Sequence, residues 1–115
     1  MQYFHRGDFK LEGAVELFSG VWAKDIYIDD KAMVLYVYLT NDVPMHSHPN
    51  LQMGFVLMGE AEFTIGDVTE KLGPGTYYVM PSGVKHGVKV LGSELLVIDI
   101  FIPPREDYIS KFSGK

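Results

Sequence analysis

Turn-forming residues recur at short intervals along this chain, and their spacing limits the folds that are open to it. They are Asp29-Asp30, Asn41-Asp42, Met58-Gly59, Gly66-Asp67, Gly73-Pro74-Gly75, Pro81-Ser82-Gly83 and Gly92-Ser93. Parallel strands need crossover connections of a dozen or more residues, usually helical, and the segments between these turns show no convincing helical period. We therefore expect short antiparallel strands.

Residues of high β propensity fill the intervals between the turns. We expect strands over 32–40, 51–58, 60–65, 76–80 and 94–102. Short strands with this spacing favour a sandwich or a barrel. A short helix is expected only over 105–112, which follows the double proline Pro103-Pro104. The sequence thus predicts one all-β domain, spanning residues 1–115, with a short helical segment at its C-terminal end.

Composition and charge limit the binding partners and the cellular location that we expect for the chain. The net charge of -5 comes without any basic run, which argues against nucleic acid as a partner. No apolar stretch approaches the ~20 residues that span a bilayer, so no membrane partner is expected and the cytoplasm is the expected location. The absence of cysteine excludes disulfides, thiolate metal sites and a cysteine nucleophile.

Three histidines and one glutamine form a candidate metal site. His46 and His48 are two residues apart, so both imidazoles project to one face of an extended segment. After the bend at Pro49-Asn50, Gln52 can reach back toward this pair, and His86 arrives from a later strand. The set suits one divalent ion of nickel, zinc, iron, manganese or copper. A His-x-His spacing alone also occurs in ordinary loops. His5 is interpreted as a surface or hydrogen-bonded core residue and not as a ligand.

The order of these residues resembles the two motifs of the cupin superfamily. His46-Ser-His48-Pro-Asn-Leu-Gln52 followed by Gly59 resembles the first motif, and Gly75, Pro81-Ser-Gly83 and His86 resemble the second. The resemblance implies a cupin (double-stranded β-helix, jelly-roll) barrel. Departures from the pattern are Thr40, Val90 and Gln52, which stand where the superfamily usually has glycine, asparagine and glutamate. An amide in place of a carboxylate leaves the charge of a bound metal undiminished and favours anionic ligands.

Three further residues near the C-terminal end are candidates for catalysis. Asp99 interrupts an apolar strand on the face that it shares with Phe101, where burial and a nearby metal would push its pKa in opposite directions. A hydrogen-bonded structural aspartate is the alternative. Arg105 has the fork geometry for a carboxylate, although it can equally pair with Glu106 or Asp107. Phe101 alone is more typical of core packing.

The segment from Asp99 to Tyr108, taken with the first motif, resembles a narrower group. These are the small, KdgF-like cupins of pectin and alginate degradation, which linearise unsaturated uronates. In that group the positions of Asp99, Phe101 and Arg105 line the catalytic pocket. The resemblance implies a non-redox enzyme that converts a small anionic sugar, a 4,5-unsaturated monouronate, to the open-chain 4-deoxy-5-keto uronate. A dioxygenase that uses iron or copper, a non-catalytic sugar-binding cupin and an inert barrel with a vestigial site are the alternatives.

The strand 94–102 is apolar on both of its faces. One face can cover the interior of the barrel, and the other needs a second cover. We therefore expect a homodimer.

Overall fold

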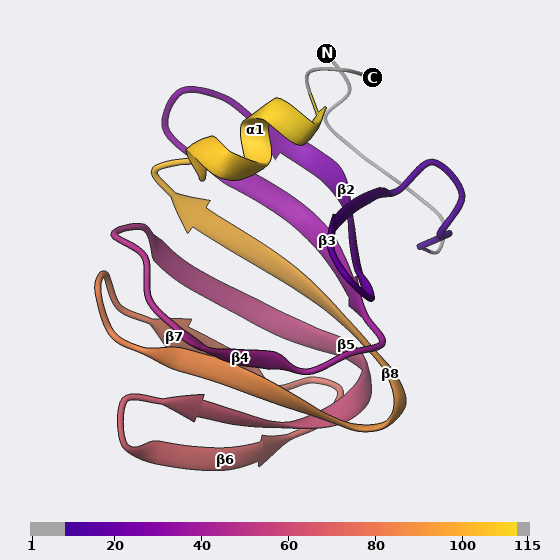
Figure 1. Ribbon diagram of the computed structural model, residues 1–115, viewed down its shortest axis with the longest axis vertical. Coiled ribbons are helices and arrows are strands. Elements are labelled where there is room, and N and C mark those ends of the chain that lie inside the picture. Colours follow the sequence, from indigo (N-terminus) through magenta and orange to yellow (C-terminus); the bar gives the residue numbers. More distant parts are fainter. Residues whose placement is uncertain (1–8, 113–115) are drawn as a thin grey trace.

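The computed structural model of the chain describes residues 9–112, so His5 lies outside the described residues. The described residues form eight strands and one helix (Figure 1). The elements are β1 (Val15–Phe18), β2 (Val21–Ile28), β3 (Met33–Leu39), β4 (Val43–His46), β5 (Leu51–Ile65), β6 (Val68–Leu72), β7 (Tyr77–Met80), β8 (His86–Ile102) and α1 (Glu106–Phe112). The expected antiparallel, all-β architecture is confirmed, as is the short C-terminal helix.

Strands β5 and β8 pair with each other along most of their lengths and run through both halves of the molecule. The N-terminal part of β5 pairs with β7, and the C-terminal part of β8 pairs with β3. From β3 the sheet continues to β2 and β1. The C-terminal part of β5 pairs with β6, and the N-terminal part of β8 pairs with β4. The two halves curve toward each other, with β6 at one end and α1 at the other (Figure 1). The result is a two-layered barrel of the jelly-roll type.

Two expected turns prove to be bends inside continuous strands. Met58-Gly59 lies within β5 and Gly92-Ser93 lies within β8, so the segments expected at 51–58 and 60–65 are one strand. The register of β5 against β8 shifts between Val56 and Met58 and again between Gly59 and Glu60. These bulges bend the strand from one half of the barrel to the other. They also turn Met58 outward, although simple alternation from Gln52 places it inside.

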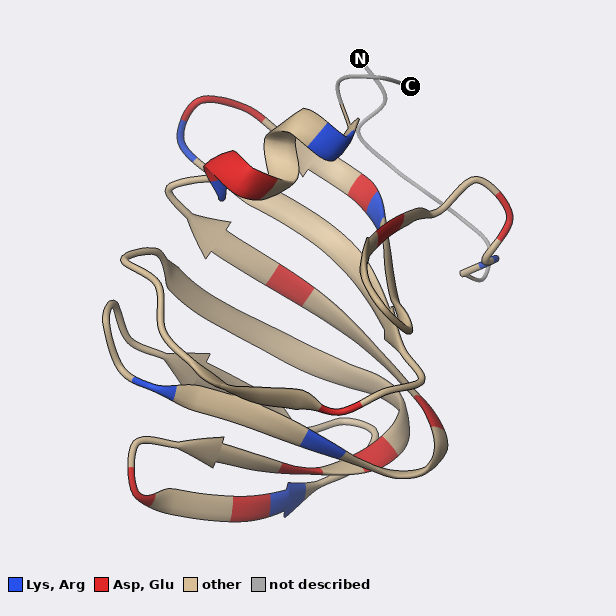
Figure 2. Cartoon of the chain, viewed as in Figure 1, with Lys and Arg blue, Asp and Glu red and all other residues tan. Residues whose placement is uncertain are grey.

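The core consists of the inward-facing side chains of both halves. In β3, alternate residues from Met33 to Leu39 are buried, and in β8 Leu95, Val97, Asp99 and Phe101 share the inner face. In Figure 2 the charged residues lie mainly on the helix, on the loops and on the strands around β6. Among residues 9–112 no helix is long and apolar enough to cross a membrane.

Gly59 and Gly92 offer a matched test of the β5–β8 crossing. Both have a left-handed φ, of 86° and 87°, so alanine at either position is expected to cost about 1–2 kcal/mol through the backbone. A Cβ at Gly59 would also collide with the backbone carbonyl of Glu94, whereas one at Gly92 meets nothing within 4 Å. Urea unfolding of the metal-free proteins should therefore show Gly59→Ala to be less stable than Gly92→Ala by at least about 1 kcal/mol. Equal losses would show that the strands separate easily at this point.

Candidate metal centre

The three predicted histidine ligands come together at one end of the barrel. Pairing of β4 with β8 sets His46 directly opposite His86. Their ring centroids lie 4.5 Å apart, and the ring of His48 lies 4.8 Å from that of His86. One possible ligand atom from each of the three residues can be chosen so that all lie within 4.8 Å of one another.

Backbone carbonyls fix the orientation of all three rings. The Nδ1 atoms of His46, His48 and His86 lie 2.8, 3.0 and 2.9 Å from the carbonyl oxygens of Pro44, Asn50 and Val84. A carbonyl oxygen only accepts, so each Nδ1 carries the proton and donates it. Each Nε2 is then left with a free lone pair. Metal-binding histidines are held in this way by their second nitrogen.

The Nε2 atoms have the surroundings that a cation requires. Nε2 of His86 is the one buried side-chain nitrogen or oxygen in residues 9–112 without a hydrogen-bond partner. Burial lowers the pKa of His86 to about 4 and also lowers that of His48, so both imidazoles are neutral at pH 7. Nε2 of His48 faces Oε1 of Gln52 at 3.0 Å, one lone pair toward another. A divalent metal ion fits this arrangement, with Gln52 as the fourth ligand.

Gln52 also contacts Asp99, and this second contact assigns the orientation of its amide. The Gln52 side chain hydrogen-bonds to the Asp99 carboxyl group, which accepts from the NH2 group when it is ionised. The amide oxygen is then the atom that points to His48. The opposite orientation would set two oxygen acceptors against each other at Asp99. One side chain thus joins the imidazole cluster to the buried carboxylate.

Asp99 is held in the barrel interior by a second donor. The hydroxyl of Tyr78 donates to Oδ1 of Asp99 at 2.5 Å, and Gly54, opposite Asp99 in β5, leaves room for this contact. A Cβ at Gly54 would lie 2.6 Å from Oδ1. Burial raises the pKa of Asp99 to about 6, against the opposing effect of both hydrogen bonds. Burial also raises the pKa of Tyr78 well above its usual value, so its hydroxyl remains a donor.

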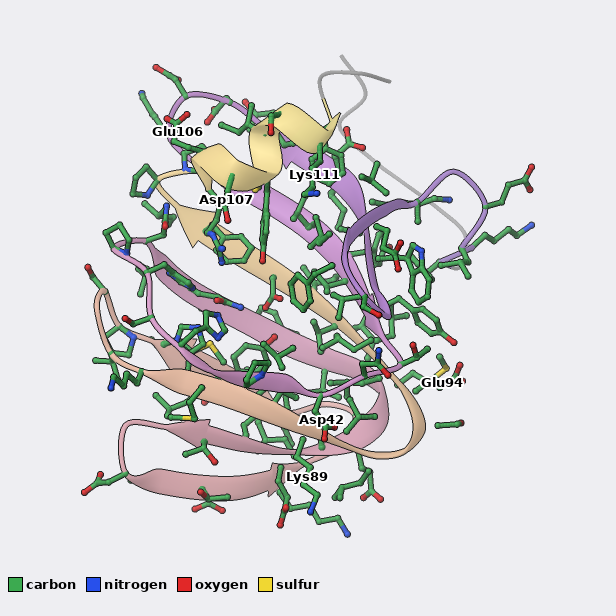
Figure 3. The ribbon with its side chains drawn as sticks, in the orientation of Figure 1. Asp42, Lys89, Glu94, Glu106, Asp107 and Lys111 are labelled. Carbon is green, nitrogen blue, oxygen red and sulfur yellow. The ribbon has the colours of Figure 1, made fainter. Side chains whose placement is uncertain are left out.

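Arg105 lies at the opening of the same interior, paired with Asp107. Its Nε and one terminal nitrogen donate to the two carboxylate oxygens of Asp107 at 3.1 and 2.7 Å. Its guanidinium carbon lies 4.0 Å from the ring centroid of Tyr108 and 5.5 Å from that of Phe101. Asp107 lies in the first turn of α1, near the end of β8 (Figure 3). The Arg105 side chain is only 12% exposed, against 61% for Asp107.

Asn50, which was not among the candidate site residues, ties together the loops around the site. Its side-chain nitrogen donates to the carbonyls of Pro103 and Pro104 at 2.8 and 3.2 Å. Its backbone carbonyl accepts a hydrogen bond from Nδ1 of His48. The loop that carries His48 is thereby fixed to the segment that leads to Arg105. The one signal in the sequence was an asparagine at the bend between two candidate ligands.

Arg105 lines both an interior cavity and a groove at the end of the barrel. An interior cavity of about 50 Å³ is lined by residues that include His46, Gln52, His86, Asp99 and Arg105. A groove of about 790 Å³ at the end of the barrel is lined by His48, Asn50, Arg105 and Asp107, among others. Pockets for small molecules usually measure about 300–1,000 Å³. The cavity suits an ion, and the groove suits a small organic ligand.

A jelly-roll barrel with an imidazole cluster at one end is the architecture of the cupins, and residues 34–102 match the model of the cupin domain. The chain belongs to this family. Among similar solved structures, KdgF from a Halomonas species is 28% identical with a TM-score of 0.77, over 83% of this chain and 91% of that one. An RmlC-like cupin from Shewanella frigidimarina is 22% identical with a TM-score of 0.80, over 94% and 96%.

A curated relative, H2HPP isomerase from Bacillus subtilis, is 35% identical over 74 residues. This match covers 63% of the present chain and 31% of the isomerase. The chain thus spans about a third of the length of that relative. The expectation of a small cupin that resembles KdgF is confirmed by the family match and the structural similarity.

Replacement of one ligand tests the cluster directly. His86→Ala removes the imidazole with the unpartnered Nε2, and affinity for Ni²⁺ or Zn²⁺ should fall by more than about 100-fold, the upper end of what loss of a hydrogen-bond partner to a ligand costs. Isothermal titration of the metal-free proteins measures this change. His5→Ala is the control and should bind one ion per chain, like the wild type. Unchanged affinity in His86→Ala would remove His86 from the ligand set.

The stability of the metal-free protein should depend on the Asp99 carboxyl. Its pKa of about 6 in the folded state lies above the usual 3.8, so the folded state takes up this proton first as the pH falls. The wild type should therefore gain about 1 kcal/mol relative to Asp99→Asn between about pH 7.5 and about pH 5. Urea unfolding of both proteins at both pH values measures the difference, and the histidines, present in both, cancel. A pH-independent difference would mean that Asp99 titrates normally.

Proposed function

We propose that this cupin is an enzyme that opens the ring of 4,5-unsaturated monouronates in a metal-dependent reaction. The observation that carries the proposal is that the buried Asp99 carboxyl group lines the same interior cavity as His46, Gln52 and His86 of the candidate metal centre. Arg105 and Phe101 border the same cavity. The substrate class rests on the resemblance of the segment from Asp99 to Tyr108 to the cupins of pectin and alginate degradation, and the similarity to KdgF supports it.

The reaction balances without an oxidant or reductant, because the product is an isomer of the substrate. The hydroxyl on the anomeric carbon loses its proton, the bond from this carbon to the ring oxygen breaks, and an aldehyde forms. The ring oxygen becomes the enol oxygen of the adjacent double bond, and protonation of the neighbouring carbon yields the ketone. The chemistry therefore needs a group that moves protons and a site that binds an anion.

The side chains of the chain match these two needs. Asp99, with a pKa of about 6, can hold or release a proton near neutral pH. Tyr78 fixes one of its oxygens, which orients the carboxyl group. Arg105 offers its fork to the sugar carboxylate in place of Asp107. Phe101 is 2% exposed and packs edge-on against His48. The Arg105 guanidinium lies over its ring, so Phe101 forms an apolar wall of the cavity.

His46, His48, Gln52 and His86 would hold the metal ion. When bound, a divalent ion supplies Lewis acidity toward the oxygens of an anionic sugar. Imidazoles that ligate a metal are neutral and Gln52 carries an amide, so none of the four side chains would offset the positive charge. This electrostatic balance favours a carboxylate-bearing ligand.

The test is incubation of the metal-loaded protein with unsaturated galacturonate. We expect the ultraviolet absorbance of the ring double bond to disappear faster than in a protein-free control. Asp99→Asn should lower the rate by at least about 100-fold, the scale of general acid–base catalysis, with an unchanged metal content. Asp67→Asn, an exposed carboxylate in the β5–β6 turn, is the matched control and should keep full activity.

Other outcomes point elsewhere. No acceleration with unsaturated uronates from pectin and from alginate would contradict the proposal. Dioxygen uptake by the iron- or copper-loaded protein would favour the dioxygenase alternative. Binding of the sugar without turnover would favour a ligand-binding cupin. Full activity of Asp99→Asn would remove Asp99 from the mechanism.

A further inference from the structure

Arg105 carries a largely buried positive charge at the opening of the interior cavity. A buried charge is retained only where neighbouring groups stabilise it. Its ion-pair partner is Asp107, whose own side chain is mostly exposed. When the sugar carboxylate takes the place of Asp107, as proposed above, this ion pair is given up. Another contact must then keep the guanidinium in position.

The ring of Tyr108 supplies such a contact. The guanidinium carbon of Arg105 lies 4.0 Å from its centroid, well within the ~6 Å over which a cation is attracted to an aromatic face. Phe101, the aromatic residue among the candidates from the sequence, is further away at 5.5 Å. The two rings meet edge-on, with centroids 5.8 Å apart and an angle of 84° between their planes. Two perpendicular rings therefore border the guanidinium, and Tyr108 is the nearer.

The contact of Tyr108 with Arg105 is one between a neutral ring and a cation. Burial raises the pKa of the Tyr108 hydroxyl to about 12, against the opposing effect of Arg105, so the hydroxyl stays protonated at pH 7. Tyr108 is only 8% exposed, and attraction of a cation to a ring is stronger where water is excluded. Because the ring face makes this contact, a phenylalanine at position 108 retains it.

The backbone of the first turn of α1 sets the ring beside the guanidinium. Residues three apart lie on the same side of a helical turn, as Arg105 and Tyr108 do. The carbonyl of Arg105 accepts hydrogen bonds from the amides of Tyr108 and Ile109 at 3.1 and 3.0 Å. Asn50 holds the carbonyls of the two prolines before Arg105. The spacing of the two side chains is therefore fixed by the main chain on both sides.

We propose that Tyr108 is a positioning residue, whose ring holds the Arg105 guanidinium at the opening of the cavity, ready to receive the carboxylate of the ligand. The inference rests on the proposed function for the identity of that carboxylate, but not for the position of Arg105. The ring contact persists when a ligand displaces Asp107. It therefore acts on the free and the ligand-bound protein alike, without taking part in proton transfer.

Chemical modification of Arg105 tests its position without any need for turnover. Phenylglyoxal attacks accessible guanidinium groups, and peptide mass spectrometry gives the rate at Arg105, with Arg6, the other arginine of the sequence, as the internal reference. Tyr108→Leu removes the ring and should raise the rate at Arg105 at least about 5-fold. Tyr108→Phe keeps the ring and should react like the wild type.

Phe112→Leu is the matched control. It removes a second aromatic side chain from α1 that is equally buried, at 9% exposed against 8% for Tyr108. Phe112 does not line the cavity, so Arg105 should react in this variant as in the wild type. Circular dichroism verifies that each variant is folded, and Tyr108→Met replaces Tyr108→Leu if the latter does not fold.

Kinetics with unsaturated galacturonate give a second measurement. Because the ring supports Arg105 before and during the reaction alike, Tyr108→Leu should raise KM at least about 5-fold and leave kcat within about 2-fold. Its metal content should equal that of the wild type. Tyr108→Phe should retain both kinetic constants.

Four results would overturn the proposal. They are an unchanged modification rate of Arg105 in Tyr108→Leu, an equal rise in Phe112→Leu, a loss of function in Tyr108→Phe, and a fall in kcat with an unchanged KM in Tyr108→Leu. The second would give α1 a purely structural role, and the third would move the role from the ring to the hydroxyl. A wild type without turnover contradicts the proposed function instead, and the modification rates alone then decide for or against the position of Arg105.

Discussion

The antiparallel pairing of β5 with β8 is the interaction on which the rest of the structure depends. It extends from Leu51 opposite Ile102 to Ile65 opposite His86, through a bend at Gly59. The same register sets Gln52 opposite Phe101 and Gly54 opposite Asp99. A slip by one residue would turn every inward side chain of one strand to the outside. The geometry of the candidate site is therefore a property of the strand register as much as of the side chains.

Burial controls the chemistry of the polar groups in the barrel. It keeps His86 neutral and raises the pKa of Asp99, and neither group has an opposite charge in direct contact. Gln52 fits between His48 and Asp99 because its NH2 group donates to the Asp99 carboxylate while its oxygen stays free to face the candidate metal centre. Glutamate at this position would set a second carboxylate against Asp99. The departure of Gln52 from the usual cupin motif thus has a local physical reason in addition to its effect on the charge of the site.

Much of this arrangement could be predicted from the sequence, because it depends on local signals. The spacing of His46, His48 and His86 with their glycines and prolines indicated the cluster, and alternation along β8 placed Asp99 inside. Strands with less regular patterns escaped prediction. In β2 the register shifts between Asp25 and Tyr27, which breaks the alternation. In β6 the residues are mostly exposed and polar, as is common at the edge of a sheet. Tyr78, and not its neighbour Tyr77, contacts Asp99 because of the register in which β7 pairs with β5. No local pattern in the sequence encodes this register.

The ion pair of Arg105 with Asp107 has a consequence for which anions the protein can select. An anion that binds the Nε edge of the Arg105 guanidinium must displace a carboxylate tethered two residues away, which competes at an effective concentration on the order of millimolar. An anion with no other contact gains little from this exchange. A ligand that also reaches the imidazole cluster draws on two attractions, and the tethered carboxylate opposes only one of them. The ion pair thus discriminates against simple salts in favour of molecules that carry both a carboxylate and further oxygen atoms.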